Sequence, residues 1–289
     1  MRSALRRSLV KAAGFGSAQA GSAIHVELKP QSSPVNGRLW GRRALDWANI
    51  QEGTVKTVYE AVLERTRVGP DTRYLDVGCG AGGAVQLAAA RGAQASGIDA
   101  ADTLLAIARE RTPKGDFRIG DLEALPFDDA VFDVVTGFNS FQYAANPAVA
   151  LGEARRVTKA EGVIVVMTWG VPEGMQAAAL VAALRSLLPL PPPGAPGPFA
   201  LSDEATLRAF AASAGLTPIE VFDVDSPWAY LDETTAVRGL NSSGVSTRAM
   251  ENSSEAAVSE AHRQALAPFR LTDGSYRIGA SFRCLLARP

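Results

Sequence analysis

Four glycines fall within six residues in the stretch YLDVGCGAGGA, residues 74–84, directly after a short apolar run that carries one acid. Gly78, Gly80 and Gly83 satisfy the spacing G-x-G-x-x-G. Between a strand and a helix, this spacing is typical of a turn whose backbone approaches a nucleotide closely. The alternative interpretation is a glycine-rich turn that has no ligand.

Asp76 discriminates between the possible nucleotides, because it lies near the carboxyl end of the strand that leads into the loop. A dinucleotide would bring a doubly anionic pyrophosphate here. One contact at about 4 Å with an effective dielectric constant near 20 would cost about 4 kcal/mol. S-adenosylmethionine has no phosphate, and its sulfonium and ammonium groups favour a nearby carboxylate. Its amino-acid end can also hydrogen-bond the backbone that the glycines leave bare.

Two further acids follow the next two predicted strands. Asp99 ends the second predicted strand, in the segment GIDA, and could accept hydrogen bonds from both ribose hydroxyls, as in dinucleotide folds. Asp121 follows the third predicted strand, in the segment GDLEALPF, and could accept from the exocyclic amine of adenine, with the Leu122 amide facing a ring nitrogen. Helix capping is the alternative for Asp99, and a turn residue is the alternative for Asp121.

Alternating strands and helices must position these acids. Residues 38–66 read as one amphipathic helical stretch. Strands are expected at 73–78, 93–99, 116–120, 131–138 and 162–169, with helices at 83–90, 102–111 and 146–158. Asp102 is the expected N-cap of the second helix, and Asn146 with Pro147 begins the third. Strands separated by helices predict right-handed βαβ units and a parallel sheet covered on both faces.

The regularity breaks after Trp169. Residues 171–200 contain an apolar helix and then a proline-rich run. Residues 201–216 predict a helix that Ser202 caps and Gly215 ends. A strand at 217–225, a mostly polar and partly helical stretch at 226–274, and a terminal strand at 276–288 complete the chain.

The segments LDVGCGAGG, GIDA, GDLEALPFDDAVFDVVTGFNSFQY and EARRVTKAEGVIVV, in this order, resemble the class I S-adenosylmethionine-dependent methyltransferases of the small-molecule type 11 branch. The resemblance is dense over 38–169 and loose over 201–225 and 276–288. It implies an α/β, Rossmann-like sheet of seven strands, six parallel and the last antiparallel, with helices on both faces. The strand at 217–225 would pair with 279–287, and helical insertions at about 171–200 and 226–275 would form a substrate cap.

The same resemblance implies which residues bind S-adenosylmethionine, whose product is S-adenosylhomocysteine. The methionyl end would contact Asp76, Gly78, Cys79 and Gly80, while Asp99 would hold the ribose. Adenine would lie among Ala100, Asp121 and Leu122. Backbone groups of Phe138 and Asn139 would meet the methionyl ammonium. Trp40 and Trp47 belong to the helix that folds over the cofactor in relatives, or else are ordinary core aromatics.

The acceptor pocket should lie over the carboxyl ends of the strands, because open α/β sheets bind ligands there. Its walls would come from the N-terminal helix, the 139–145 loop and both insertions, and its candidate residues are Phe141, Gln142, Tyr143, Trp169, Trp228 and Tyr230. Many relatives have a histidine near the position of Gln142, and glutamine cannot act as a general base. His262 is the remaining candidate base if its helix covers the site; otherwise it is an exposed histidine. His25, the other histidine, lies in the N-terminal extension.

Composition narrows the remaining possibilities. The formal net charge of −1 gives no electrostatic footprint for nucleic acid. The two cysteines, Cys79 and Cys284, lack the spacing of a metal site or disulfide framework, and no apolar run is long enough to span a membrane. Residues 1–30, basic and acid-free before Glu27, are expected to be a disordered or non-native extension, with a targeting peptide as the alternative. Residues 31–289 are expected to form one cytoplasmic methyltransferase domain.

The leading functional hypothesis is methyl transfer from S-adenosylmethionine to a small organic acceptor by in-line displacement, driven mainly by proximity and orientation. A nicotinamide-dependent oxidoreductase is the first alternative, which Asp76 disfavours. The second alternative is a relative that binds the cofactor and catalyses nothing. The residues from 38 to 169 are compatible with the first and the last of these. Whether oxygen, nitrogen or carbon receives the methyl group is not determined by the sequence.

Overall fold

A computed structural model describes residues 32–191 and 196–289 of the chain, and these residues belong to one compact unit. The expectations for residues 1–30, including the targeting peptide and His25, lie outside the described residues, as does part of the proline-rich run. Within the described ranges, no helix has the length and apolar character that crossing a membrane requires.

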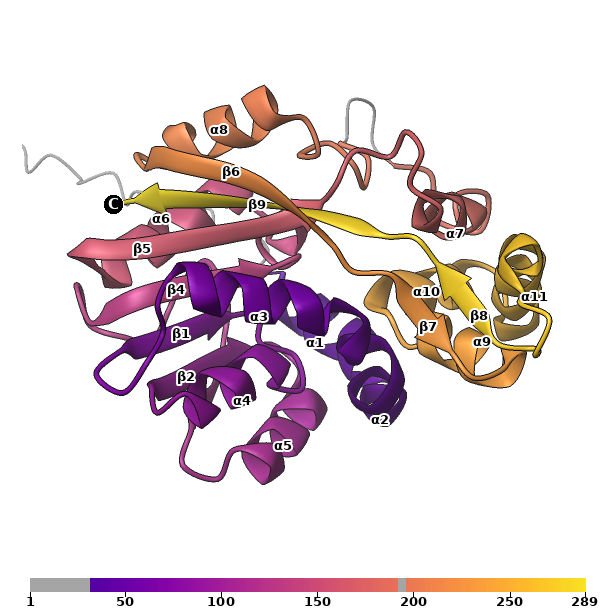
Figure 1. Ribbon diagram of the computed structural model, residues 1–289, viewed down its shortest axis with the longest axis horizontal. Helices are drawn as coiled ribbons and strands as arrows, with labels where there is room; N and C mark the ends of the chain where they lie inside the picture. Colours follow the sequence, from indigo (N-terminus) through magenta and orange to yellow (C-terminus); the bar gives the residue numbers. More distant parts are fainter. Residues whose placement is uncertain (1–31, 192–195) are drawn as a thin grey trace, which may run out of the picture. The chain divides into compact units, whose positions relative to one another are not determined.

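Seven strands form one sheet in the order β3-β2-β1-β4-β5-β9-β6 (Figure 1). The strands are β1 Arg73–Val77, β2 Gln94–Asp99, β3 Asp116–Ile119, β4 Phe132–Phe138, β5 Thr158–Trp169, β6 Thr217–Asp225 and β9 Ser281–Arg288. Strand β9 runs antiparallel to both β5 and β6, and the other pairs are parallel. This confirms the expected sheet of six parallel strands and one antiparallel strand, including the pairing of β6 with β9.

The expectation of one terminal strand over 276–288 is wrong. Residues Tyr276–Ile278 form β8, which pairs with β7 Trp228–Tyr230 in a separate two-stranded sheet. The chain changes sheets at Gly279, whose amide donates to the side chain of Gln176 at 2.6 Å. The amide of Ser226 then donates to the carbonyl of Ala280, which fixes the crossing point.

Helices cover both faces of the large sheet, and each face has its own apolar core. Helices α3 Lys56–Arg65, α4 Gly83–Ala90 and α5 Asp102–Arg111 lie on one face, with α6 Pro147–Val157 and α8 Glu204–Ser213 on the other (Figure 1). The first core includes Leu63, Val85 and Leu105, and the second includes Leu151 and Leu207. The strand order reverses on either side of β1, so ligands of such a sheet bind at the carboxyl end of β1.

Helix ends explain two local corrections. Asn146 caps α6 with a hydrogen bond from the Val149 amide, as expected. Asp102 is not the cap of α5, because the N-cap residue is Ala101, whose amide donates to the carboxylate of Asp99. Asp203, not Ser202, caps α8, accepting from the Thr206 amide at 2.8 Å. At both helices, the N-cap is the residue with extended backbone that immediately precedes the first helical residue.

The stretch expected as one helix over 38–66 is divided into several helical turns. These are α1 Ser33–Gly41, α2 Ala44–Asp46, the π-turn η1 Trp47–Gln51, the 3₁₀ turn η2 Glu52–Val55, and α3. The π-turn occurs where two polar side chains, Gln51 and Glu52, are buried against the rest of the protein, and such turns inside helices are frequent at functional sites. We call residues 33–55 the covering segment.

The insertion after β7 packs against the outside of the covering segment. It comprises α9 Glu233–Asn241, α10 Gly244–Asn252, α11 Glu255–Leu266 and η4 Ala267–Phe269, and α7 Ala177–Ala183 lies beside α11. A Cβ atom at Gly244 would come within 2.6 Å of the Trp40 ring, so the two helices touch there. Ion pairs join Arg43 to Glu255 at 2.6 Å and Arg238 to Asp46 at 2.5 Å.

Candidate functional site

A cavity lies at the carboxyl ends of β1, β2 and β4 and encloses about 670 Å³, including its open mouth. Most residues predicted to bind the cofactor line it, namely Trp40, Trp47, Gly78, Gly80, Asp99, Ala100, Asp121, Leu122, Phe138 and Asn139. The structure therefore brings together side chains that are spread over a hundred positions of the sequence.

The glycine loop forms one wall because its backbone adopts conformations that favour glycine. Gly78 has φ +79° and Gly80 has φ +54°. A Cβ atom at Gly78 would stand 2.4 Å from the Cβ atom of Ser140, so this position is closed to any side chain. The amides of Gly78 and Cys79 both donate to the carbonyl of Ile98, at 2.8 and 2.9 Å. These two loop amides therefore already have a partner within the protein.

Asp99 ends β2 and braces the loop from the opposite side of the cavity. Its carboxylate accepts from the Gly80 amide at 2.9 Å and from the Ala101 amide at 2.8 Å. Burial raises the pKa of this carboxyl, although the two amides oppose the shift. Asp99 lines the cavity and does not cap α5, whose N-cap is Ala101, so the helix-capping alternative for Asp99 is wrong.

Asp121 joins the loop after β3 to the covering segment. Its carboxylate accepts from the Ser33 amide at 3.2 Å and from the Glu123 amide at 2.9 Å. An isolated β-bridge between Asp121 and Ala124 closes a turn, so Asp121 is also the turn residue that the alternative interpretation predicted. Leu122 lies beside it on the cavity wall.

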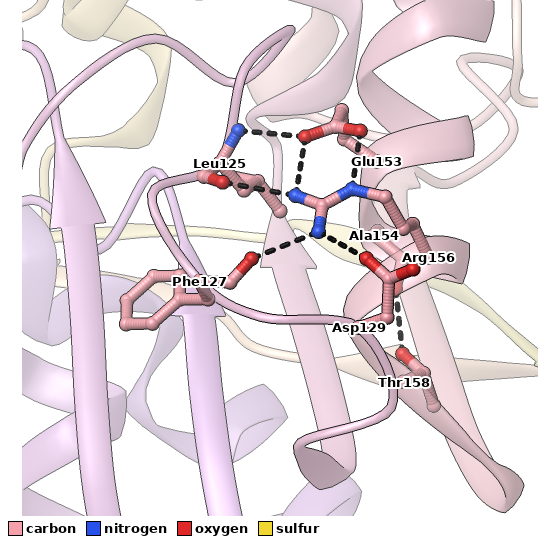
Figure 2. A network of polar contacts seen from close by, with 7 residues as sticks. All are labelled: Leu125, Phe127, Asp129, Glu153, Ala154, Arg156 and Thr158. Atoms are coloured by element: carbon pink, nitrogen blue, oxygen red, sulfur yellow. Dashed lines mark hydrogen bonds and ion pairs between the residues drawn. The ribbon is translucent and has the colours of Figure 1, made fainter.

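A polar network fixes the loop that carries Asp121 (Figure 2). The guanidinium of Arg156, on α6, donates to the carbonyls of Leu125 and Phe127 at 2.9 and 2.8 Å, and it pairs with Asp129 and Glu153. Glu153 in turn accepts from the Leu125 amide at 2.8 Å. The hydrogen bond with Arg156 is the main cause that lowers the pKa of the Glu153 carboxyl. The loop is thereby held to a rigid helix, so Asp121 is well positioned.

Asp76 and Cys79 are not among the described residues that line the cavity. Asp76 is 3% exposed, and its carboxylate accepts from the Thr136 hydroxyl at 2.8 Å. Burial in the central strand, which is covered on both faces, raises the pKa of this carboxyl to about 7. The Cys79 side chain packs toward Gly97 and burial raises the pKa of its thiol. Contrary to expectation, both side chains are enclosed by the protein in this structure.

Two polar atoms on the cavity wall are buried without a hydrogen-bond partner among the described residues. They are Nε1 of Trp47 and Oγ of Ser140. The Trp47 nitrogen would lie 3.2 Å from a Cβ atom at Gly80, and Ser140 contacts Gly78, so both atoms flank the glycine loop. A buried polar group without a partner costs about 1–3 kcal/mol. A ligand that brings hydrogen-bonding oxygens to this loop would satisfy both atoms, and S-adenosylmethionine fits this requirement with its carboxylate and ribose hydroxyls.

The residues predicted for an acceptor pocket do not form one pocket. Phe141 is fully buried against Gly137 in the core beneath α6, because the short helix η3 Phe141–Tyr143 turns its ring inward. Gln142 donates to the side chain of Asn139 at 2.9 Å. Tyr143 lines the same cavity as Trp40, and their rings meet edge to face with centroids 5.4 Å apart.

The other three predicted aromatics lie elsewhere. Trp169 packs between Trp228 and Phe282, with ring centroids 5.9 and 5.1 Å away. The Tyr230 hydroxyl donates to the buried side chain of Gln51 at 2.9 Å. Neither insertion contributes a residue to the described wall of this cavity. Both insertions and α1 line a second pocket, with Pro189 from the first insertion and Arg248, Glu251 and Asn252 from the later one, so their part in an acceptor site stays a prediction. The later insertion instead braces the covering segment from outside.

His262 is neither exposed nor at the cavity. It is 2% exposed on α11, and its Nδ1 atom is hydrogen-bonded to the Asn241 side chain at 2.8 Å. Burial lowers the pKa of this imidazole to about 4, so it is neutral at physiological pH. The expected role as an exposed residue is wrong, and its position among α9 and α11 removes it from the candidates for a base at this cavity.

Three functional candidates were not predicted from the sequence. Ser140 and Asn36 line the cavity, and Asn36 also donates to the carbonyl of Tyr143 at 2.8 Å. Glu52 is buried behind the glycine loop beside Arg111. Only Ser140 had a local signal, because it directly follows Asn139 at the end of a predicted strand.

Comparison with known proteins identifies the segment around the cavity. Residues 75–166 match the model of the family described as "Methyltransferase domain", type 11. This segment is a class I S-adenosylmethionine-dependent methyltransferase domain. It contains the glycine loop, Asp99, Asp121 and the Arg156 network, so the family assignment and the cavity coincide.

Curated relatives of the methyltransferase domain act on different acceptors. The malonyl-(acyl-carrier protein) O-methyltransferase of Erwinia pyrifoliae is 38% identical over 109 residues, which is 38% of this chain and 42% of that protein. The demethylmenaquinone methyltransferase of Renibacterium salmoninarum is 35% identical over 123 residues, 43% of this chain and 52% of that protein. The chain thus spans about half the length of the curated relatives it matches.

Solved structures share the fold over a larger part of the chain. A putative methyltransferase from Bacillus halodurans covers 80% of this chain and 97% of its own, with a TM-score of 0.53 and 15% identity. The (4+2)-cyclase SpnF covers 81% of this chain and 80% of its own, with a TM-score of 0.51 and 21% identity. At these identities the similarity shows the fold alone.

Proposed function

We propose that the protein transfers the methyl group of S-adenosylmethionine to a small organic acceptor. The observation that carries the proposal is the cavity at the switch point of the sheet, which is lined by the glycine loop, Asp99 and Asp121 of the methyltransferase domain. The unpartnered atoms of Trp47 and Ser140 support it, because both flank the glycine loop and a ligand with hydrogen-bonding oxygens would give them partners.

We assign the following roles toward the cofactor. Asp99 would hold the ribose hydroxyls, and Asp121 with Leu122 would hold adenine. The indole nitrogen of Trp47 and the hydroxyl of Ser140 would meet the amino-acid end beside Gly78 and Gly80. When bound, S-adenosylmethionine supplies an electrophilic methyl group on a sulfonium. The residues around it would exclude water and align the acceptor, and such alignment contributes up to about 7–11 kcal/mol to a reaction of this kind.

The charges around the cavity favour a cationic ligand over an anionic one. Among the described residues that line it, Asp99 and Asp121 are acidic and none is basic. Asp76 is buried close by, whereas the charge of the buried Glu52 is balanced by its ion pair with Arg111. A pyrophosphate would meet carboxylates and no cationic side chain, which disfavours the nicotinamide-dependent alternative.

Apart from Asp99 and Asp121, which we assign to the cofactor, the described cavity wall offers no general base. Burial raises the pKa of the Tyr143 hydroxyl to about 12, so this group stays protonated at physiological pH. We therefore propose an acceptor that reacts in its uncharged form and without a protein base, such as the neutral form of an amine, which releases a proton to water after it is methylated. The cavity walls would then position the acceptor for attack on the methyl group, and no side chain would need to activate it.

The experiment is a turnover assay with S-adenosylmethionine and a panel of amines, phenols and enolisable acids, run on the wild type and on Asp99→Ala. Methylated product from the wild type, reduced in the variant, would support the proposal. Binding of S-adenosylhomocysteine without any turnover would support a relative that binds the cofactor and catalyses nothing. Exclusive turnover of acidic acceptors would contradict the charge argument.

A further inference from the structure

Glu52 and Arg111 form a buried ion pair behind the glycine loop. Glu52 begins η2 in the covering segment and is 4% exposed, and Arg111 ends α5. One carboxylate oxygen of Glu52 lies 2.5 Å from Nη1 of Arg111. The other accepts from the amide of Gly83, the first residue of α4, at 3.2 Å. Glu52 thus contacts the first turn of the helix that the glycine loop begins.

The same guanidinium joins two further backbone segments. Its Nη1 atom donates to the carbonyl of Ala81 at 3.0 Å, and its Nη2 atom donates to the carbonyl of Ala48 at 2.6 Å. Ala81 follows Gly80 in the glycine loop, and Ala48 follows Trp47 in the π-turn. One side chain therefore connects the segment that carries the Trp47 indole with the loop that carries Gly80.

The pair is poorly explained as a source of stability alone. Burial raises the pKa of the Glu52 carboxyl, although the charge of Arg111 opposes this shift. Replacing a buried ion pair by apolar side chains is often neutral or stabilising, so such a pair is weak evidence for a stabilising role. What an arginine fork adds is geometry, because its donors are fixed in one plane and can hold several acceptors in one arrangement.

We propose that Glu52 and Arg111 are positioning residues that hold the π-turn of the covering segment against the glycine loop, and so set the spacing between Trp47 and Gly80 for the cofactor. The identity of that cofactor rests on the proposed function, whereas the coupling of the two segments rests on the hydrogen bonds above. Neither residue lines the cavity, so both would act through the backbone that they hold.

The test compares four variants of the full chain with the wild type: Glu52→Gln, Arg111→Lys, the double change Glu52→Gln with Arg111→Met, and the control Arg208→Gln. Arg208 is paired with Glu204 on the exposed face of α8 and is far from the cavity in the fold. Three properties are measured, namely affinity for S-adenosylhomocysteine by calorimetry, the melting temperature, and hydrogen exchange of the segments 47–52 and 80–84 without ligand.

We expect Glu52→Gln and Arg111→Lys to weaken binding by about tenfold or more, because a hydrogen bond to a charged group is lost or misdirected. Lysine keeps the charge but cannot hold both carbonyls, so it should not rescue affinity. The double variant should regain melting temperature relative to Glu52→Gln, because no unpaired charge remains, while its affinity stays low. Exchange of both segments should be faster in every variant except the control.

Recovery of affinity together with stability in the double variant would overturn the proposal, because the pair would then be merely structural. If the wild type binds no S-adenosylhomocysteine, the proposed function fails while the exchange data still decide this inference. Unchanged exchange in both segments would overturn it in that case, and faster exchange would sustain the coupling of the segments. If Glu52→Gln does not fold, Arg111→Lys and the double variant provide the same comparison.

Discussion

Replacing Asp76 with asparagine removes a buried charge that opposes folding at neutral pH. The structure raises the pKa of this carboxyl from 3.8 to about 7, chiefly through burial. In the unfolded chain the group ionises at the lower pKa, so the wild type loses stability as the pH rises from about 4 through about 7. A shift of about three pKa units corresponds to about 4 kcal/mol once the loss is complete.

Between about pH 5.5 and about pH 8 the loss due to Asp76 amounts to about 2 kcal/mol. Asparagine can still accept the hydrogen bond from Thr136, and it has no charge to desolvate. We therefore expect Asp76→Asn to be more stable than the wild type without ligand, and by about 2 kcal/mol more at the higher pH than at the lower.

The assay is urea denaturation at both pH values for the wild type, Asp76→Asn and the control Asp71→Asn, which lies exposed in the turn before β1. The difference in the free energy of unfolding between the wild type and Asp76→Asn reports on this carboxyl alone, because the other titrating groups are the same in both proteins. An equal pH dependence in the two proteins would refute the reasoning, because the carboxyl would then ionise alike in the folded and unfolded states. Greater stability of the wild type at the higher pH would refute it more strongly.

Three other substitutions, with Gly152→Ala as a matched control, test the site and the core beside it. Asp99→Ala should weaken S-adenosylhomocysteine binding in calorimetry by about 1–3 kcal/mol, and unchanged affinity would remove Asp99 from the site. Gly78→Ala should lower the free energy of unfolding by more than about 1 kcal/mol, because φ is positive and the new atom would meet Ser140. Gly152→Ala, in a helix with open space, should be neutral or stabilising, and equal losses would refute the argument. Phe141→Ala should cost about 3–5 kcal/mol of stability, and an unaltered denaturation midpoint would place this ring outside the core.

The parts of the fold that were predictable follow local patterns. The brevity and apolar content of residues 73–77 and 162–169 indicated buried strands, and Asn146 with Pro147 marked a helix start that the structure confirms. These features depend on neighbours in sequence, so the chain alone reveals them. The alternation of strands and helices predicted a parallel sheet, whereas the number of strands and the antiparallel last strand came from the family resemblance.

The sequence did not predict which way some side chains point or which residues distant in the chain are in contact. Phe141 and Tyr143 are two residues apart in a short helical turn, yet one ring enters the core and the other lines the cavity. Their spacing does not specify which way the turn faces. Asp76 was expected to meet a ligand because of its place in the strand, but its burial depends on helices that cover both sides of the sheet. Glu52 and Arg111 lie in different helical segments, and no local pattern connects them.

Calorimetric titration of the purified chain with S-adenosylhomocysteine, with NAD in a parallel experiment, tests the central claim most directly. The account predicts saturable binding of S-adenosylhomocysteine at one site and no binding of NAD, because the cavity presents Asp99 and Asp121 and no basic residue among those described. Binding of NAD with no response to S-adenosylhomocysteine would contradict the account, since the carboxylates around the glycine loop would then face a pyrophosphate.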